Sequence, residues 1–203
     1  RKNLIRSDQL PYHVTTRANN KLWFTLPLEE VWEISKKCIK EAHDLHPVEI
    51  ISFVLMSNHY HLLLRTPKAN LDSFMYEFNK RLAFCLKDKT GHINHILGGR
   101  YKWCLIQSQD YFKNCYRYIY QNPKRAMQIM RCEEYPFSTL HYLLSNKQFA
   151  VTLYAEMDLN DPNVINWLNE NIDEAESTLL QNGLRKSEFK DLIDRSSRRK
   201  KII

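Results

Sequence analysis

The feature that most constrains this 203-residue chain is an apolar run over residues 51–65, broken in the middle by Ser57-Asn58. Two apolar segments around a short polar break predict two strands joined as a β-hairpin. Side chains two apart on a strand point to the same face, so His59 and His61 should lie side by side and Tyr60 on the opposite face. Two neutral imidazoles on a rigid sheet make a good partial site for a divalent metal. The alternative is two unrelated histidines at a strand edge.

The other periodic segments predict the order strand, helix, strand, strand, helix, strand, helix. These elements are strand 12–17, helix 27–46, strands 48–56 and 59–65, a helix from 70 or 72, a loop over 91–99, strand 101–107 and helix 110–121. A βαββαβ order is typical of an α+β fold, a ferredoxin-like or RRM-like antiparallel sheet sandwich with helices on the faces. The same architecture serves RNA-binding modules and several nucleases, so the fold alone does not decide function.

The charge of the chain is unevenly distributed. Residues 151–176 contain seven acids and no Lys or Arg, whereas residues 177–203 contain eight bases and three acids. With a total of +7, the first 150 residues carry a net charge of +9. A basic body of this size indicates a polyanionic partner, most simply nucleic acid. We therefore expect a domain over 1–150 and, over 151–203, an acidic and then basic helical extension, with helices near 162–172 and 186–193 and a basic tail at 196–201.

Cysteine usage and hydropathy indicate the compartment. The chain has five cysteines, an odd number, and none of them forms a Cys-x-x-Cys pair. This argues against a disulfide framework or a structural zinc site and fits a reducing cytoplasm. No apolar run approaches the roughly 20 residues that cross a bilayer, so we expect no membrane association. A cytoplasmic, nucleoid-associated protein is the expectation that fits a nucleic-acid partner.

Tyr118 and Asn122 are spaced i, i+4, and on a continuous helix they share one face. Pro123 disfavours helical geometry at Asn122 and predicts that the helix ends or kinks there. A tyrosine hydroxyl is a poor nucleophile at its ordinary pKa of about 10. It becomes useful where a metal polarises a target phosphate. The alternative is that Tyr118 is a core residue, the commoner role of an aromatic side chain on an apolar helix face.

Several segments together carry a resemblance to a known family. They are Tyr12-His-Val-Thr-Thr-Arg-Ala-Asn-Asn20, Met56-Ser-Asn-His-Tyr-His-Leu-Leu-Leu64, Gly99-Arg-Tyr-Lys102, Tyr118-Ile-Tyr-Gln-Asn-Pro-Lys-Arg-Ala126 and Tyr135-Pro-Phe-Ser-Thr139. In this order and spacing the chain resembles the single-tyrosine HUH transposases, and specifically the REP-associated tyrosine transposases of bacteria, over about residues 10–145.

The resemblance implies a role for each matching residue. His59 and His61 would bind a divalent metal, Mg or Mn, and Asn122 would supply a third ligand. Tyr118 would be the nucleophile of a transesterification on single-stranded DNA, which leaves a 5′-phosphotyrosine link and a free 3′-hydroxyl. The strand could then be rejoined elsewhere without ATP.

Two positions depart from the family pattern. Tyr60 places an aromatic side chain between the two histidines, where the family has an aliphatic one. Tyr120 lies close enough in sequence to Tyr118 to be a rival nucleophile. A helix rotates about 200° over two residues, so the two tyrosines cannot both face one metal.

The substrate implied by the resemblance is a DNA hairpin from a repeated palindromic element, cut beside its stem. Basic residues near the motifs are candidate phosphate contacts, and aromatic residues near them could stack unpaired bases. The basic candidates are Arg100, Lys102, Lys124 and Arg125, and the aromatic ones are Tyr101, Trp103 and Tyr12. The family resemblance leaves open whether the protein is a monomer or a homodimer.

Two other functions remain open at this level. The first is an RRM-like nucleic-acid-binding module without catalysis, which should show aromatic RNP motifs where this chain has histidines. The second is a metal-dependent hydrolase in which Tyr118 is structural and no covalent intermediate forms.

Overall fold

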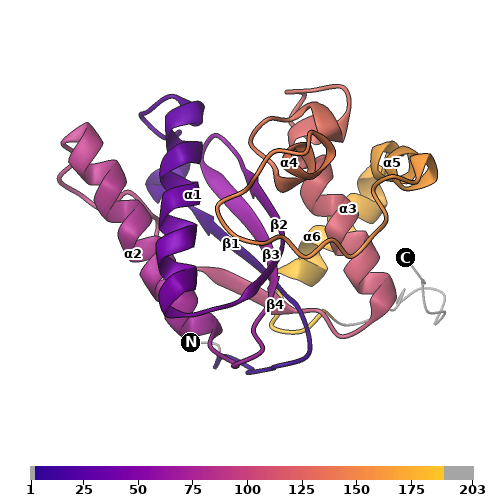
Figure 1. Ribbon diagram of the computed structural model, residues 1–203, viewed down its shortest axis with the longest axis horizontal. Helices are drawn as coiled ribbons and strands as arrows, with labels where there is room; N and C mark the ends of the chain where they lie inside the picture. Colours follow the sequence, from indigo (N-terminus) through magenta and orange to yellow (C-terminus); the bar gives the residue numbers. More distant parts are fainter. Residues whose placement is uncertain (1–2, 190–203) are drawn as a thin grey trace.

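A four-stranded antiparallel sheet forms the middle layer of the protein, as the computed structural model, which describes residues 3–189, shows (Figure 1). The strands stand in the order β2-β3-β1-β4. Their bounds are Tyr12–Arg17 for β1, Glu49–Leu55 for β2, His59–Arg65 for β3 and Lys102–Leu105 for β4. The predicted hairpin is β2–β3, closed by a hydrogen bond from the Met56 amide to the His59 carbonyl at 2.7 Å. The predicted α+β sandwich and its βαββαβ order are confirmed.

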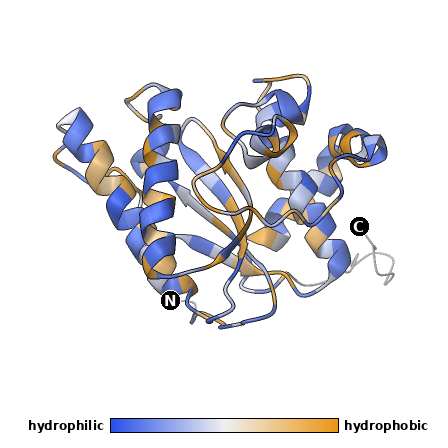
Figure 2. Ribbon diagram, in the orientation of Figure 1, coloured by the Kyte–Doolittle hydropathy of each residue, from blue (hydrophilic) through white to orange (hydrophobic). Residues whose placement is uncertain are grey.

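Helices cover both faces of the sheet (Figure 1). One face carries α1 (Leu28–Leu45) and α2 (Leu71–Thr90), and the other carries α3 (Gln109–Arg125) with the later helices around it. Those later helices are α4 (Thr139–Leu144), α5 (Pro162–Asn169) and α6 (Glu174–Leu184), and two short 3-10 turns are η1 (Asn19–Lys21) and η2 (Cys132–Glu134). The turns of α1 mix hydrophilic and hydrophobic residues in Figure 2, as expected for a helix with one face on a sheet. No helix within residues 3–189 is long and apolar enough to cross a membrane.

The side chains of strand β3 point alternately into two different hydrophobic cores, one on each face of the sheet. Tyr60 and Leu62 are fully buried in the cluster under α1 and α2, whereas Leu63 belongs to the cluster under α3. His61 therefore faces α3 as well, because side chains two apart share a face. The Tyr60 hydroxyl hydrogen-bonds to Thr16 Oγ1 at 2.8 Å and to Asn79 Oδ1 at 2.6 Å. The aromatic residue that interrupts the histidine pair is thus a core residue of the opposite face.

Helix α3 runs through Pro123 to Arg125, so the prediction that it ends at Asn122 is wrong, and a kink there stays a prediction. A proline has no N–H for the carbonyl four residues earlier, here that of Ile119. The Asn122 side chain takes over this role, since its Nδ2 donates to the Tyr118 carbonyl at 2.8 Å and to the Ile119 carbonyl at 3.3 Å. The side chain that precedes the proline therefore offsets the backbone bond that the proline removes.

The C-terminal extension packs directly on α3. Leu168, Leu180, Leu184 and Phe189 are buried in the same cluster as the apolar face of that helix. The predicted helix near 162–172 is confirmed as α5. The helix predicted at 186–193 is wrong for its described part. The chain there forms a bridge between Glu188 and Leu105 of β4, and the helix lies earlier, at α6. The division at residue 150 stays a prediction, and the basic tail lies outside the described residues.

Acids of the segment 151–176 pair with bases of the body. Glu156 forms an ion pair with Arg65. Glu170 and Glu176 approach the guanidinium of Arg117 on α3 at 3.7 and 3.3 Å. These acids therefore neutralise bases on the α3 side of the molecule.

The hydroxyl of Tyr60 allows a test of the fold apart from the histidines. We expect Tyr60→Phe to lower the free energy of unfolding by about 1–2 kcal/mol, because it leaves the part-buried side-chain oxygen of Asn79 without its donor. Urea denaturation would measure the change, with Tyr154→Phe at a partly exposed tyrosine as the control. An unchanged unfolding midpoint for Tyr60→Phe would contradict this account.

Candidate active site

A cavity of about 610 Å³ opens where β1 and β3 meet the C-terminal ends of α3 and α6. Six of its lining side chains are cationic: Arg17, Lys21, Arg100, Lys102, Arg125 and Arg185. None of the described residues that line it is an aspartate or a glutamate. A concave surface lined with one sign of charge concentrates the field and attracts the opposite ion. This cavity is therefore shaped and charged for a polyanion.

His59 and His61 lie side by side on the wall formed by β3, as their spacing predicts. Their ring centroids are 5.0 Å apart with the ring planes at 75°. Burial lowers the pKa of His59 to about 4. Burial also lowers the pKa of His61 well below its ordinary value, with nearby cationic and imidazole groups acting in the same direction. Both imidazoles are thus neutral near pH 7, which is the form that binds a metal.

Each of these rings is held through one nitrogen. The Nδ1 of His59 lies 2.7 Å from the Asn58 side-chain oxygen, an acceptor, so this nitrogen carries the proton and Nε2 keeps its lone pair. The Nδ1 of His61 lies 2.9 Å from Nε2 of His13. With the proton of this pair on His61, its Nε2 is also bare. A ligand histidine commonly donates its second ring N–H to a neighbouring acceptor in this way.

His13 is a member of this group that the sequence reasoning missed. It is buried, and its ring plane lies within 17° of that of His61, with the centroids 5.2 Å apart and the rings meeting edge to edge. The motif around it was visible in the sequence. Its contact with His61 follows from the pairing of β1 with β3, in which Thr15 stands opposite His61. An antiparallel pairing of the two segments would have been the signal that finds it.

Asn122 lines the same cavity and offers an oxygen. Because its amide nitrogen is bonded back to the helix, its carbonyl oxygen is the atom left to face a ligand. No group of three or more His, Cys, Asp or Glu side chains within residues 3–189 could hold a metal ion. Any third protein ligand beside His59 and His61 would come from another residue type. Two neutral imidazoles and an amide oxygen fit a divalent ion such as Mn or Mg.

Tyr118 lines the cavity from α3 and is only 7% exposed. Its ring meets that of His61 edge-on, with centroids 5.9 Å apart at 87°. The guanidinium of Arg125 lies 5.3 Å from the centre of the tyrosine ring. Burial raises the pKa of Tyr118, and Arg125 and Arg185 act in the opposite direction. Tyr118 is therefore the tyrosine placed beside the histidines and among cations.

Tyr120 points away from this cavity. Its hydroxyl is buried at 2.9 Å from Thr139 Oγ1, and its ring packs at 4.9 Å from that of Tyr116. The expected rotation of the helix thus separates the two tyrosines of the motif.

Comparison with known proteins identifies the family of the chain. The sequence model of the IS200-like transposases matches residues 6–122. The chain belongs to this family. The family expected from the motifs is thereby confirmed. No curated protein matches the chain.

A solved structure shares the fold. A REP-associated tyrosine transposase bound to a REP hairpin is 19% identical, with a TM-score of 0.60, over 86% of this chain and 98% of that chain. A putative transposase from Deinococcus radiodurans is 17% identical, with a TM-score of 0.41, over 59% of this chain and 92% of that chain.

Three of the four predicted basic contacts of this transposase line the cavity: Arg100, Lys102 and Arg125. Lys124 lies elsewhere. Its ammonium group donates to the Asn169 carbonyl at the C-terminal end of α5 at 2.6 Å. Its position links α3 to the extension and gives no support to a phosphate contact.

The prediction that three aromatic side chains stack unpaired bases needs correction. Tyr12 is fully buried, Trp103 is 7% exposed and Tyr101 is 8% exposed, and all three belong to the core under α1 and α2. The Tyr12 hydroxyl donates to the Ile5 carbonyl at 2.8 Å. A base cannot stack on rings whose faces are covered by other side chains, so burial removes Tyr12 and Trp103 as platforms. The guanidinium of Arg100 lies over the ring of Tyr101, 5.3 Å from its centroid.

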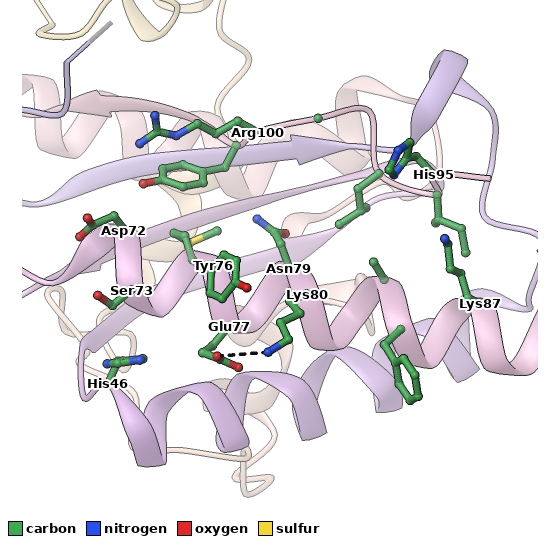
Figure 3. Close-up of a pocket in the computed structure, with 17 residues that line it drawn as sticks. His46, Asp72, Ser73, Tyr76, Glu77, Asn79, Lys80, Lys87, His95 and Arg100 are labelled. Atoms are coloured by element: carbon green, nitrogen blue, oxygen red, sulfur yellow. Dashed lines mark ion pairs between the residues drawn. The ribbon is translucent and has the colours of Figure 1, made fainter. Parts of the chain in front are cut away.

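A second and larger cavity, of about 1070 Å³, runs along α2 (Figure 3). It adjoins the first at Arg100, which lines both. Unlike the first, it contains carboxylates, those of Asp72 and Glu77, and Glu77 pairs with Lys80 across 3.6 Å. Its mixed charge makes it the poorer surface for a polyanion.

The buried histidines of the transposase predict acid sensitivity. Burial lowers the pKa of His13 to about 3 and that of His61 well below 6.5, so the unfolded chain binds more protons than the folded one below about pH 6.5. The contribution of the two histidines to the free energy of unfolding is then fully present above pH 6.5 and is lost as the pH falls toward their folded pKa values. Each of these two histidines should lower the free energy of unfolding by up to about 1.4 kcal/mol for each pH unit below 6.5.

Urea denaturation of the metal-free protein between pH 7.5 and 5 would measure this loss. His13→Gln should show a shallower dependence on pH than the unsubstituted protein. Identical slopes for the two proteins would contradict the assignment of a neutral, buried His13.

Proposed function

We propose that this transposase nicks single-stranded DNA beside a hairpin and rejoins it through a 5′-phosphotyrosine intermediate on Tyr118. One observation carries the proposal. Tyr118 stands beside two neutral histidines in a cavity that has six cationic side chains and, among its described residues, no carboxylate. A pure binding module has no use for a buried tyrosine beside a histidine pair. The family of the chain supplies independent support.

The proposed step exchanges one phosphoester bond for another. The Tyr118 oxygen attacks the scissile phosphorus and forms a Tyr–O–P bond, while the bond from phosphorus to the 3′ oxygen breaks. The tyrosine proton is lost and the leaving 3′ oxygen takes up a proton to become a hydroxyl. Because the phosphoester is kept, a 3′-hydroxyl can later attack the same phosphorus and release the tyrosine.

The histidines and Asn122 are the residues that would hold a divalent metal. A bound Mg or Mn supplies Lewis-acid polarisation of the scissile phosphate. The hydrogen bonds that His59 and His61 donate from Nδ1 to Asn58 and His13 support this role, because they leave Nε2 of each ring without a proton. The three ligands are uncharged, so the protein side of the site does not repel the phosphate.

The cationic side chains of the cavity form two groups, one near Tyr118 and one suited to the backbone of the DNA strand. Arg125 and Arg185 lie near enough to Tyr118 to oppose the rise of its pKa on burial, and this placement suits them to hold the phosphate that the tyrosine attacks. Arg100 and Lys102 lie on the side of β4 and suit the backbone of the strand. The hairpin substrate is inferred from the structural neighbour, which is bound to a REP hairpin.

The nucleophile can be tested on a denaturing gel. The protein would be incubated with labelled single-stranded oligonucleotides that carry hairpins from its own genome, with Mn or with EDTA. We expect a metal-dependent covalent protein–DNA adduct that Tyr118→Phe abolishes. Tyr120→Phe is the matched control and should keep the adduct, because its hydroxyl faces Thr139 and the core.

Other results of this experiment identify other functions. Metal-dependent cleavage without an adduct would mean a hydrolase in which Tyr118 is structural. An adduct that survives in Tyr118→Phe and is lost in Tyr120→Phe would contradict the assignment of the nucleophile. Binding without cleavage would support the non-catalytic module.

The metal ligands can be tested without DNA. Isothermal titration with Mn should show one site, and His61→Ala should weaken its affinity at least about tenfold, since it removes a ligand as well as the partner of His13. Asn122→Ala should also weaken it. His43→Ala, on α1 away from the cavity, is the control. Equal Mn affinity in His61→Ala and in the unsubstituted protein would refute the proposed site.

A further inference from the structure

The indole of Trp23 is 75% exposed, although tryptophan is usually largely buried. It stands with Leu22, which is 63% exposed, between η1 and α1. Neither side chain belongs to the buried core. Two large apolar side chains in water next to a functional cavity indicate a binding surface.

A small pocket of about 170 Å³ lies beside Trp23. Its lining combines apolar and aromatic side chains with amides, among them Leu22, Trp23 and Phe24, and Asn19, Asn20 and Asn94. An apolar cavity of about 150 Å³ holds benzene, so this pocket has the size of a single flat ring system. Ala18, Asn19 and Asn20 line both this pocket and the candidate active site, so the two cavities adjoin.

The walls of the pocket are fixed to the turn that carries His59. The side-chain Nδ2 of Asn58 donates to the Lys21 carbonyl at 2.8 Å, and the backbone N–H of Phe24 donates to the Ser57 carbonyl at 2.9 Å. The side-chain oxygen of the same Asn58 accepts the bond from His59. The Asn58 side chain therefore fixes the segment that carries Trp23 relative to His59, a proposed metal ligand. Such a pocket is preformed, which lowers the entropy cost of filling it.

We propose that the pocket beside Trp23 binds one unpaired base of the DNA strand whose phosphate Tyr118 attacks. This inference rests on the proposed function. The indole offers a flat face for stacking, and the three asparagine amides offer donors and acceptors for the edge of a base. Stacking would place the base at a fixed position relative to the scissile phosphate and so select the phosphate that is cut.

Charge favours DNA over a protein segment as the occupant. Among the residues described around this pocket there is no carboxylate, and the adjoining cavity brings Lys21 and five other cations. The groove along α2 shares His95 with the pocket and, in contrast, holds Asp72 and Glu77 (Figure 3). A strand that leaves the active site toward Trp23 meets cations and amides without carboxylates, whereas one that follows α2 meets two carboxylates among its cations.

The test compares Trp23→Ala and Trp23→Phe with Phe84→Ala. Phe84 is 70% exposed on α2 and does not line the Trp23 pocket, so it is a matched exposed aromatic. Affinity for single-stranded hairpin oligonucleotides would be measured by fluorescence anisotropy at fixed salt, because DNA affinity depends on salt. A series of oligonucleotides with one abasic nucleotide each would locate the base, and adduct formation would be measured beside it.

Trp23→Ala should bind about 5- to 100-fold more weakly, as expected for the loss of one stacked base, while Trp23→Phe keeps most of the affinity. An abasic nucleotide at one position should weaken DNA binding by the unsubstituted protein. The same abasic nucleotide should have little further effect on binding by Trp23→Ala. Phe84→Ala should bind normally. Equal affinity of Trp23→Ala and the unsubstituted protein, or an equal loss in Phe84→Ala, would overturn the proposal.

The outcome for Tyr118 remains separate from that for Trp23. If the unsubstituted protein forms no adduct but Trp23→Ala still weakens binding at one base position, the nuclease function fails and the base pocket stands. If adducts form and their yield and cut position are unchanged in Trp23→Ala, the nuclease function stands and the base pocket fails.

Discussion

The structure depends on a strand that has a different core on each of its faces. In β3, Tyr60 and Leu62 fill the apolar layer under α1 and α2, and His61 and Leu63 face α3. The apolar side chains on both faces fix the register of the strand, because a slip by one residue would exchange its two faces. The histidines are therefore held by packing that involves neither DNA nor metal. This rigidity lets two imidazoles and the tyrosine of α3 meet in one place.

Burial and charge act together around these imidazoles. The surrounding protein desolvates His13, His59 and His61 and keeps them neutral, and the neighbouring cations act in the same direction on two of them. Carboxylates near the histidines would have favoured the imidazolium form and repelled a phosphate. The acids of the C-terminal extension lie elsewhere, on Arg65 and Arg117. The distribution of charge thus leaves the cavity positive and its histidines neutral.

The sequence predicted what depends on local pattern. The hairpin, the shared face of the histidine pair and the separation of Tyr118 from Tyr120 follow from periods of two and 3.6 residues, and the structure has all three. The family followed from motifs in order. The position of α6 and the burial of Tyr12 and Trp103 did not follow, because they depend on which segments pack together. An aromatic residue in a strand motif reads alike whether it faces solvent or a helix.

Long-range pairing also explains why His13 and Trp23 escaped the sequence reasoning. His13 matters through its contact with a residue 48 positions away, and no periodicity within β1 reveals that contact. Trp23 lies in an irregular segment whose position is set by bonds from the Ser57-Asn58 turn. The turn could be predicted, but the two functions of the Asn58 side chain could not.

Pro123 shows how a local penalty can serve the site. A proline inside a helix removes one backbone hydrogen bond and usually costs about 3 kcal/mol or more. Here the freed Ile119 carbonyl accepts from Asn122, which offsets part of that cost and fixes the orientation of the amide. The bonded nitrogen points back at the helix, so the oxygen faces the cavity that Tyr118 also lines. The proposed nucleophile, Tyr118, and the proposed third ligand, Asn122, then stand one turn apart on one helix, and their spacing is set by α3 alone. Movement of the loops around the cavity would change access to the site but not the distance between these two groups.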